Sequence, residues 1–169
     1  MRDQTTSLRH WLYLGTVGPT GSMGLLILRA VVGAAFLLHG WPKIQQPFGW
    51  MGPEAPMPGV LQLLAALAEF GGGLLLILGL LTRLASLGIA GVMAVALATV
   101  HLPQGHPFVG SPGGPSFESA AVYLACAVLF LLLGPGRFSL DAALFGGPLG
   151  QAQEPRHGGH GSVGGMPSA

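Results

Sequence analysis

The residue in this sequence that most directly suggests chemistry is Glu69, a carboxylic acid near the middle of the apolar run 60–81. That run is long enough to cross a bilayer as a helix, because about 20 apolar residues span ~30 Å of hydrocarbon. An ionised carboxylate at such a depth is unfavourable on an isolated helix. We therefore expect Glu69 either to be protonated or to be compensated by another part of the chain. Ionisable residues inside membrane spans mark proton relays, ion pathways and ligand sites.

Further ionisable side chains lie within or at the ends of the other apolar runs. They are Arg29, His39, Lys43, His101 and Glu118. Carboxylates and imidazoles together suit proton transfer near neutral pH, because neighbouring groups can tune their proton affinity. His39 and Lys43 are four residues apart, so they share one helical face if the helix continues past Pro42. Pro42 itself predicts either the end of the regular helix or a kink.

The depths of Arg29 and Glu69 predict that they form an ion pair. At ~1.5 Å of rise per residue, Arg29 lies about 18 Å below Trp41 and Glu69 about 13 Å below Val60. An offset of about 5 Å is within side-chain reach. The remaining four residues fall near the outer ends of their helices. The sequence therefore predicts a polar cavity in the outer half of the protein, lined by all six.

Each residue also has a simpler interpretation. A buried Arg29–Glu69 pair can serve only to fix helix register. His39 and His101 can be interfacial residues, Lys43 a flanking residue that reaches out to water, and Glu118 an acid favoured by a helix dipole. Haem ligation by His39 and His101 is a lesser alternative. His157 and His160 are interpreted as part of a linker, and no zinc-type spacing of ligands occurs, so no metal is expected.

The composition identifies the class of protein. Half of the 169 residues are hydrophobic and 8% are charged, whereas soluble domains carry about 25% charged residues. We therefore expect an integral membrane protein. A net charge of +1 argues against nucleic-acid binding, which needs a clustered basic surface. The single cysteine, Cys126, cannot form a disulfide within the chain.

Four apolar runs are expected to position these residues in an all-α, integral membrane four-helix bundle. The predicted spans are 23–41, 60–81, 84–101 and 117–134, within one domain at 23–145. The segment 1–22 is predicted to be a cytoplasmic tail, and the Gly/Pro-rich segment 146–169 to be disordered. A short interfacial helix should follow the fourth span, with Ser139 as its N-cap and Asp141 in its first turn.

The distribution of Lys and Arg predicts the orientation in the plasma membrane. One set of tails and links carries Arg2, Arg9, Arg83, Arg137 and Arg156, and the opposite loops carry only Lys43. By the positive-inside rule both termini are expected in the cytoplasm. Lys43 and His101 then lie on the outer side.

Several short motifs resemble the DoxX family of small four-helix membrane proteins. The motifs are Arg29, His39-Gly40-x-x-Lys43, Glu69-x-x-Gly72, Gly79-x-x-Thr82-Arg83, His101, Glu118 and the segment 134–141, Gly-Pro-Gly-Arg-Phe-Ser-Leu-Asp. The resemblance covers about residues 25–144 and leaves out the tails. The family is similar to the membrane subunit of thiosulfate:quinone oxidoreductase. The resemblance implies that the same six ionisable residues line the site.

Two functions follow as hypotheses. In the first, the chain is a subunit of a sulfur- or thiol-type membrane oxidoreductase. His39 or His101 then hydrogen-bonds a quinone carbonyl, Glu69 or Glu118 carries the accompanying proton, and Arg29 and Lys43 help to bind the quinone. With no flavin or iron–sulfur motif in the chain, electrons are expected from a redox partner subunit or directly from the substrate. In the second, the chain is a non-catalytic membrane anchor, a lipid-binding helper or a small-solute carrier. Either could form a homo-oligomer.

Overall fold

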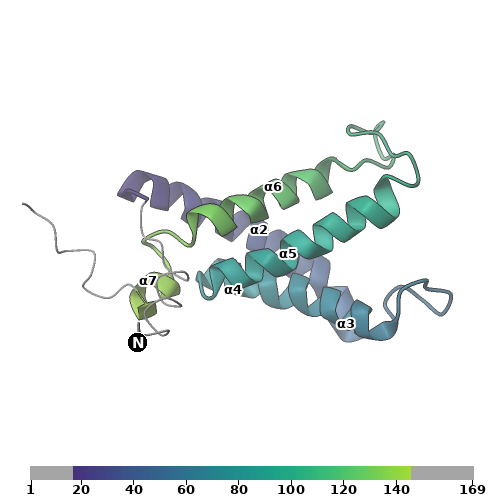
Figure 1. The fold of residues 1–169 in the computed structure, drawn as a ribbon, viewed down its shortest axis with the longest axis horizontal. Coiled ribbons are helices and arrows are strands. Elements are labelled where there is room, and N and C mark those ends of the chain that lie inside the picture. The colour runs from purple at the N-terminus through teal and green to yellow at the C-terminus, as the bar shows by residue number, and fades with distance from the viewer. Residues whose placement is uncertain (1–16, 146–169) are drawn as a thin grey trace, which may run out of the picture.

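The computed structural model describes residues 17–145, and every regular element in that range is helical (Figure 1). The predicted tails lie wholly or mostly outside this range, as do His157 and His160. The first span is α2 (Pro19–Gln45), a helix of 27 residues. It begins four residues before the predicted start, with a proline in its first turn, where the missing N–H is not needed. It also continues through Pro42, which places Lys43 on the same helical face as His39.

The second and third spans each contain a π-helical turn. The second consists of α3 (Gly59–Ala66), η1 (Leu67–Gly71) and α4 (Gly72–Leu78). The third consists of α5 (Thr82–Ala96) and η2 (Leu97–His101). With α2, these spans are long and apolar enough to cross a membrane. The fourth, α6 (Glu118–Leu133), is shorter at 16 residues, or ~24 Å of helix. A final short helix, α7 (Leu140–Phe145), follows.

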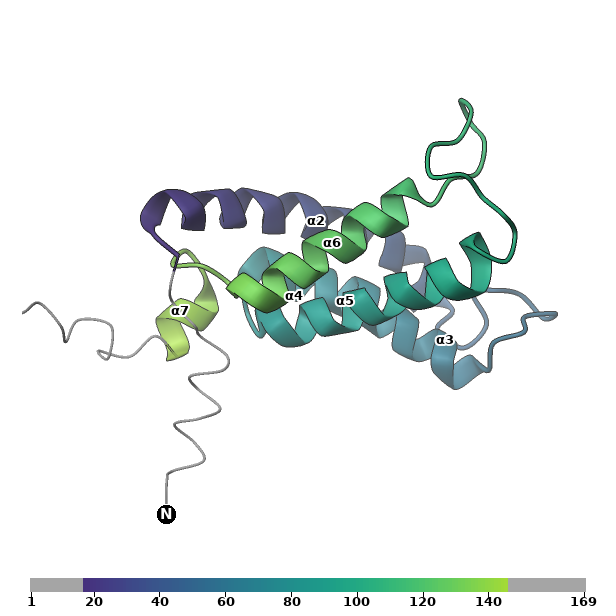
Figure 2. The same ribbon diagram turned by 45° about the horizontal axis from the view of Figure 1, so that its top comes forward.

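The four spans lie alongside one another as a bundle (Figures 1 and 2). α5 packs along α6, and α2 packs along η1 and α4, whereas α6 contacts α2 only sparsely. Phe36, Leu76, Ile89 and Phe130 are almost completely buried in the core. Many other large apolar side chains point outward, as expected when the surrounding solvent is lipid rather than water.

The bundle has two different ends. We call the end that carries segments 46–58 and 102–117 the loop end, and the opposite one the α7 end (Figure 1). At the α7 end the Asp141 carboxylate accepts hydrogen bonds from the backbone N–H groups of Leu81 (2.7 Å) and Thr82 (2.9 Å). It thereby caps the start of α5 from a distant part of the chain. Ser139 caps α7 through its Oγ, which accepts from the Ala142 N–H at 3.0 Å, and this confirms the predicted N-cap.

Gly79 ends α4 in the left-handed conformation, with φ of 66°. A Cβ at this position would stand 1.8 Å from Arg29 Nη1. We expect Gly79→Ala to lower the free energy of unfolding by about 2 kcal/mol, because the new methyl group both clashes and strains the backbone. The midpoint of thermal unfolding in detergent, followed by far-UV circular dichroism, measures the loss.

Gly24→Ala is the matched control for Gly79→Ala. Gly24 is an exposed helical glycine, and a Cβ there would meet nothing within 4 Å. This variant should be more stable by roughly 0.5 kcal/mol, because alanine favours helix. Equal midpoints for the two alanine variants would show that the turn at Gly79 tolerates a side chain.

Candidate functional site

The centre of the candidate site is an ion pair between Lys43 and Glu69. Lys43 Nζ lies 2.6 Å from Glu69 Oε1. The Glu69 side chain is 3% exposed and that of Lys43 is 23% exposed. Glu69 Oε2 is buried as well, and it has no hydrogen-bond partner among the described residues. One oxygen of the carboxylate is therefore left without a donor among the described residues.

The segment after α2 covers the ion pair on the side of the loop end. Lys43 Nζ lies 4.5 Å from the centre of the Trp50 ring, a cation–π distance. Trp50 Nε1 donates to the Gln62 carbonyl oxygen at 3.0 Å. The buried Gln62 side chain accepts from the Met51 N–H and donates to the Met57 carbonyl oxygen. These bonds fix the position of the Trp50 ring relative to α3 and keep it close to Lys43.

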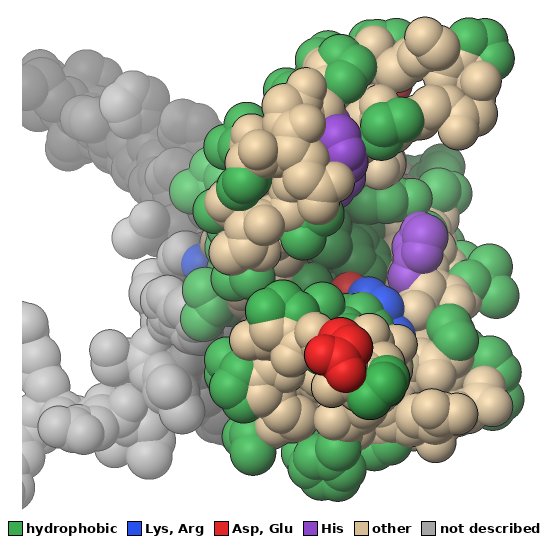
Figure 3. Space-filling model, turned by 90° about the vertical axis from the view of Figure 1, so that its right-hand side faces the viewer, with side chains coloured by type: hydrophobic (Ala, Val, Ile, Leu, Met, Phe, Trp, Pro, Cys, Tyr) green, Lys and Arg blue, Asp and Glu red, His purple; other side chains and the backbone are tan. Residues whose placement is uncertain are grey.

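Glu69 faces a cavity of about 160 Å³ inside the loop end of the bundle. We call it the polar cavity. Its lining residues come from α2, η1, α5, η2 and α6, and they are Phe36, His39, Lys43, Glu69, Met93, Ala96, His101, Ser119, Ala120 and Tyr123. Viewed end-on, the molecule is hollowed between its two long loops, with acidic and basic side chains inside the hollow and histidines beside it (Figure 3). A dry cavity of about 150 Å³ can hold one benzene molecule, so the polar cavity has the size of a single ring.

The two imidazoles occupy different parts of the wall. His39 projects from α2 one turn before Lys43, and its ring lies 6.4 Å from that of Tyr123. His101 ends η2, and its Nδ1 lies 3.1 Å from Nδ1 of His106. A hydrogen bond between these two nitrogens requires one ring to donate and the other to accept. The bond ties the 102–117 segment to the end of the third span.

Glu69 and His101 both lie in π-helical turns. A π turn inserts one extra residue into a helix and so changes the direction in which the following side chains point. Such turns are rare and occur frequently at functional sites. Two of them on neighbouring spans, each contributing an ionisable side chain to the same cavity, distinguish this end of the bundle from the α7 end.

The predicted pairing of Arg29 with Glu69 is wrong. Arg29 is fully buried at the α7 end, where its Nη2 donates to the Phe138 carbonyl oxygen. The Asp141 charge also attracts its guanidinium. The depth estimate failed because α2 extends to Gln45, which moves Arg29 farther from the loop end than a helix ending at Trp41 would. Lys43 supplies the counter-charge instead.

Four of the six predicted site residues therefore meet in the polar cavity, namely His39, Lys43, Glu69 and His101. Glu118 lies beside it, in a second hollow on α6. Sequence reasoning missed Tyr123 and Ser119, which line both spaces. A signal was available for Tyr123, because it is a phenol within an apolar run. Among residues 17–145, no cluster of three or more His, Cys, Asp or Glu side chains could hold a metal ion.

The long apolar helices and their exposed apolar side chains identify a multi-pass helical membrane protein. The sequence profile of the DoxX family matches residues 24–102. The chain is 30% identical over 127 residues to Inner membrane protein YqjF of Escherichia coli K12, covering 72% of this chain and 92% of that protein. It is 33% identical over 127 residues to Inner membrane protein YphA of the same strain, covering 69% and 87%.

A third relative comes from Bacillus subtilis strain 168 and is named "Putative oxidoreductase CatD". It is 30% identical over 131 residues, which cover 74% of this chain and 90% of the relative. No solved structure matches the chain significantly. The chain belongs to the DoxX family, and it is a multi-pass protein of the plasma membrane.

Proposed function

We propose that this protein is the membrane subunit of a quinone-linked oxidoreductase and that the polar cavity holds the quinone ring. The observation that carries the proposal is the free oxygen of Glu69. A buried carboxylate oxygen without a partner is unfavourable, and Glu69 lines a cavity of about 160 Å³. A ring with hydroxyl groups at its edge, as in the reduced form of a quinone, would occupy that volume and donate the missing hydrogen bond.

The residues that line the cavity fit a quinone. Its two carbonyl oxygens need hydrogen-bond donors, which His39 and His101 can provide from two sides of the cavity. A bound quinone accepts two electrons and two protons. In this proposal Glu69 would carry one of the two protons, and Lys43 would stabilise the negative charge of the carboxylate after that proton has left. Phe36 and Tyr123 add apolar ring surface on the α2 and α6 sides.

Arg29 and Glu118 take no direct part in this proposal. Arg29 lies at the opposite end of the bundle, and Glu118 faces the neighbouring hollow. Electrons would come from a partner subunit, since one cysteine cannot ligate an iron–sulfur cluster. The name of the Bacillus subtilis relative, which includes the word oxidoreductase, supports a redox role. That partner subunit would also bind the sulfur or thiol substrate.

Glu69→Gln is expected to weaken binding of the reduced quinone roughly tenfold, because the variant loses the charge-assisted hydrogen bond that a hydroxyl group of this ligand donates to the carboxylate, worth about 1.5 kcal/mol. The full chain is placed in lipid nanodiscs and titrated with a ubiquinone that carries a decyl chain, in its reduced form. Trp50 reports binding through fluorescence quenching because it lies beside Lys43. Trp11 and Trp41 are replaced by phenylalanine so that Trp50 alone emits.

Glu54→Gln is the matched control, because Glu54 is an exposed acid in the 46–58 loop outside the cavity. Its dissociation constant should equal that of the unchanged protein. Absence of saturable quenching in the unchanged protein would refute the proposal. Equal affinities of the Glu69 and Glu54 variants would remove Glu69 from the binding site.

A further inference from the structure

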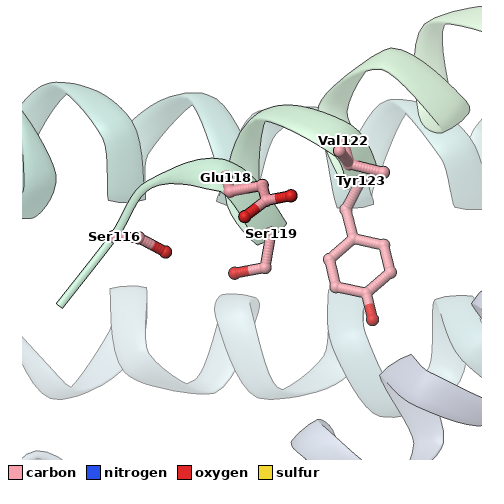
Figure 4. Close-up of a pocket in the computed structure, with 5 residues that line it drawn as sticks. All are labelled: Ser116, Glu118, Ser119, Val122 and Tyr123. Atoms are coloured by element: carbon pink, nitrogen blue, oxygen red, sulfur yellow. The ribbon is translucent and has the colours of Figure 1, made fainter. Parts of the chain in front are cut away.

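The second hollow lies directly beside the polar cavity. Its volume is about 310 Å³, and its lining residues come from the start of α6 and the loop just before it (Figure 4): Ser116, Glu118, Ser119, Val122 and Tyr123. We call it the α6 hollow. Ser119 and Tyr123 line both spaces. These two side chains are therefore the partition between the hollow and the cavity.

Tyr123 forms the larger part of that partition. Its ring extends away from α6 (Figure 4) and reaches the side chains of α2. The centre of the ring lies 5.0 Å from that of Phe36 and 6.4 Å from that of His39, both in edge-on geometry. Single edge-on contacts are weak. Rotation of this one side chain about its χ1 would give up these two ring contacts and join the two spaces.

The seam between α2 and α6 is the open side of the bundle. α6 packs along α5 and touches α2 only sparsely. His39 on α2 is exposed, and so are Glu118, Ser119 and Val122 on α6, although His39 and Ser119 also line the polar cavity. Val122 is 50% exposed and lies one turn inside the apolar span. The seam thus presents polar side chains near the membrane surface and the apolar side chain of Val122 just below them.

We propose that the α6 hollow is the entrance through which a ligand dissolved in the bilayer reaches the polar cavity, and that Tyr123 is its gate. The ligand class is a ring with polar edges that carries an apolar chain. The cavity has room for one ring, since about 150 Å³ accommodates a benzene molecule. The chain must then remain outside, along Val122 and the lipid. The identity of the ring as a quinone rests on the function proposed above, but the route does not.

The route is tested by the rate of binding rather than by catalysis. Val122→Phe fills the α6 hollow without changing a residue of the polar cavity. In the nanodisc assay with Trp50 as reporter, we expect this variant to bind the decyl-chain ubiquinone roughly tenfold more slowly, while the quenching at saturation is unchanged. Tyr123→Ala should have the opposite effect, with faster association and faster dissociation, because the gate is missing.

Val128→Phe is the matched control, since Val128 is also exposed on α6 but lies outside both spaces. It should bind at the rate of the unchanged protein. Retained quenching with equal rates in the Val122, Tyr123 and Val128 variants would overturn the gate and leave the loop end as the route. Absence of quenching in the unchanged protein would instead refute the quinone proposal, and with it the quinone as ligand of this entrance.

Discussion

Replacing Asp141 with alanine is expected to lower the free energy of unfolding by about 4 kcal/mol. Asp141 is fully buried, and its two oxygens accept the N–H groups of Leu81 and Thr82. The alanine variant leaves both donors without this acceptor and deprives the buried Arg29 of its nearby negative charge. The midpoint of thermal unfolding in detergent should fall by roughly 10 °C.

Three further variants separate the causes of this loss. Asp141→Asn keeps one acceptor oxygen but removes the charge, so its loss should be intermediate. Ser139→Ala removes the N-cap of the same short helix, together with the hydrogen bond that its Oγ donates to the Gly136 carbonyl oxygen, and should cost about 1 kcal/mol. Arg29→Met combined with Asp141→Ala should be more stable than Asp141→Ala alone, because no buried cation remains. If Asp141→Ala unfolds at the same temperature as Ser139→Ala, the α7 end does not depend on this carboxylate.

The four spans and their packing into one bundle could be predicted from the sequence, because the length of each apolar run fixes where its helix begins and ends. The four apolar runs gave the spans to within a few residues at most ends. Ionisable residues at one end of each run must meet when antiparallel helices pack side by side, and His39, Lys43, Glu69 and His101 do so. The orientation of the bundle across the membrane stays a prediction from the distribution of Lys and Arg.

The pairing of charges could not be predicted from depth alone. Proline is expected to end a helix, yet α2 continues through Pro42, and this brings Lys43 rather than Arg29 to Glu69. The two π turns leave no mark in the apolar pattern, although each adds a residue that shifts the side chains around Glu69 and His101. An estimate of depth from residue counts assumes regular helices. Its error is therefore as large as the length of a side chain, and it cannot decide which charged residues form a pair.

The contacts of the α7 end were hidden for a different reason. The sequence motifs there contain the right residues, since Gly79, Asp141 and Arg29 all belong to them. Nothing in the spacing, however, shows that Asp141 caps a helix that begins 59 residues earlier. Tyr123 was overlooked because an aromatic residue in an apolar run is usually part of the core. The role of Asp141 depends on a tertiary contact between distant segments, which local patterns do not encode.

Replacing Lys43 with methionine is expected to destabilise the protein by about 3 kcal/mol, because Glu69 would then be a buried carboxylate without its counter-charge. Methionine keeps most of the volume of the lysine stem, so the loss reports the charge rather than a cavity. Thermal unfolding in detergent, followed by far-UV circular dichroism, measures it. The loss should be somewhat smaller than for Asp141→Ala, since Lys43 is partly exposed and water can partly replace it.

The double variant Lys43→Met with Glu69→Gln decides whether the pair serves stability or function. A buried ion pair replaced by neutral residues of similar volume often leaves stability unchanged, so this variant should recover most of the loss caused by Lys43→Met. It should nevertheless bind the reduced decyl-chain ubiquinone as weakly as Glu69→Gln does, because the carboxylate that accepts from the ligand's hydroxyl group is still absent. Stable protein with impaired binding would show that the charges are kept for the ligand. Recovery of both properties would assign the pair a structural role, and failure to recover stability would show that Lys43 acts through contacts other than Glu69.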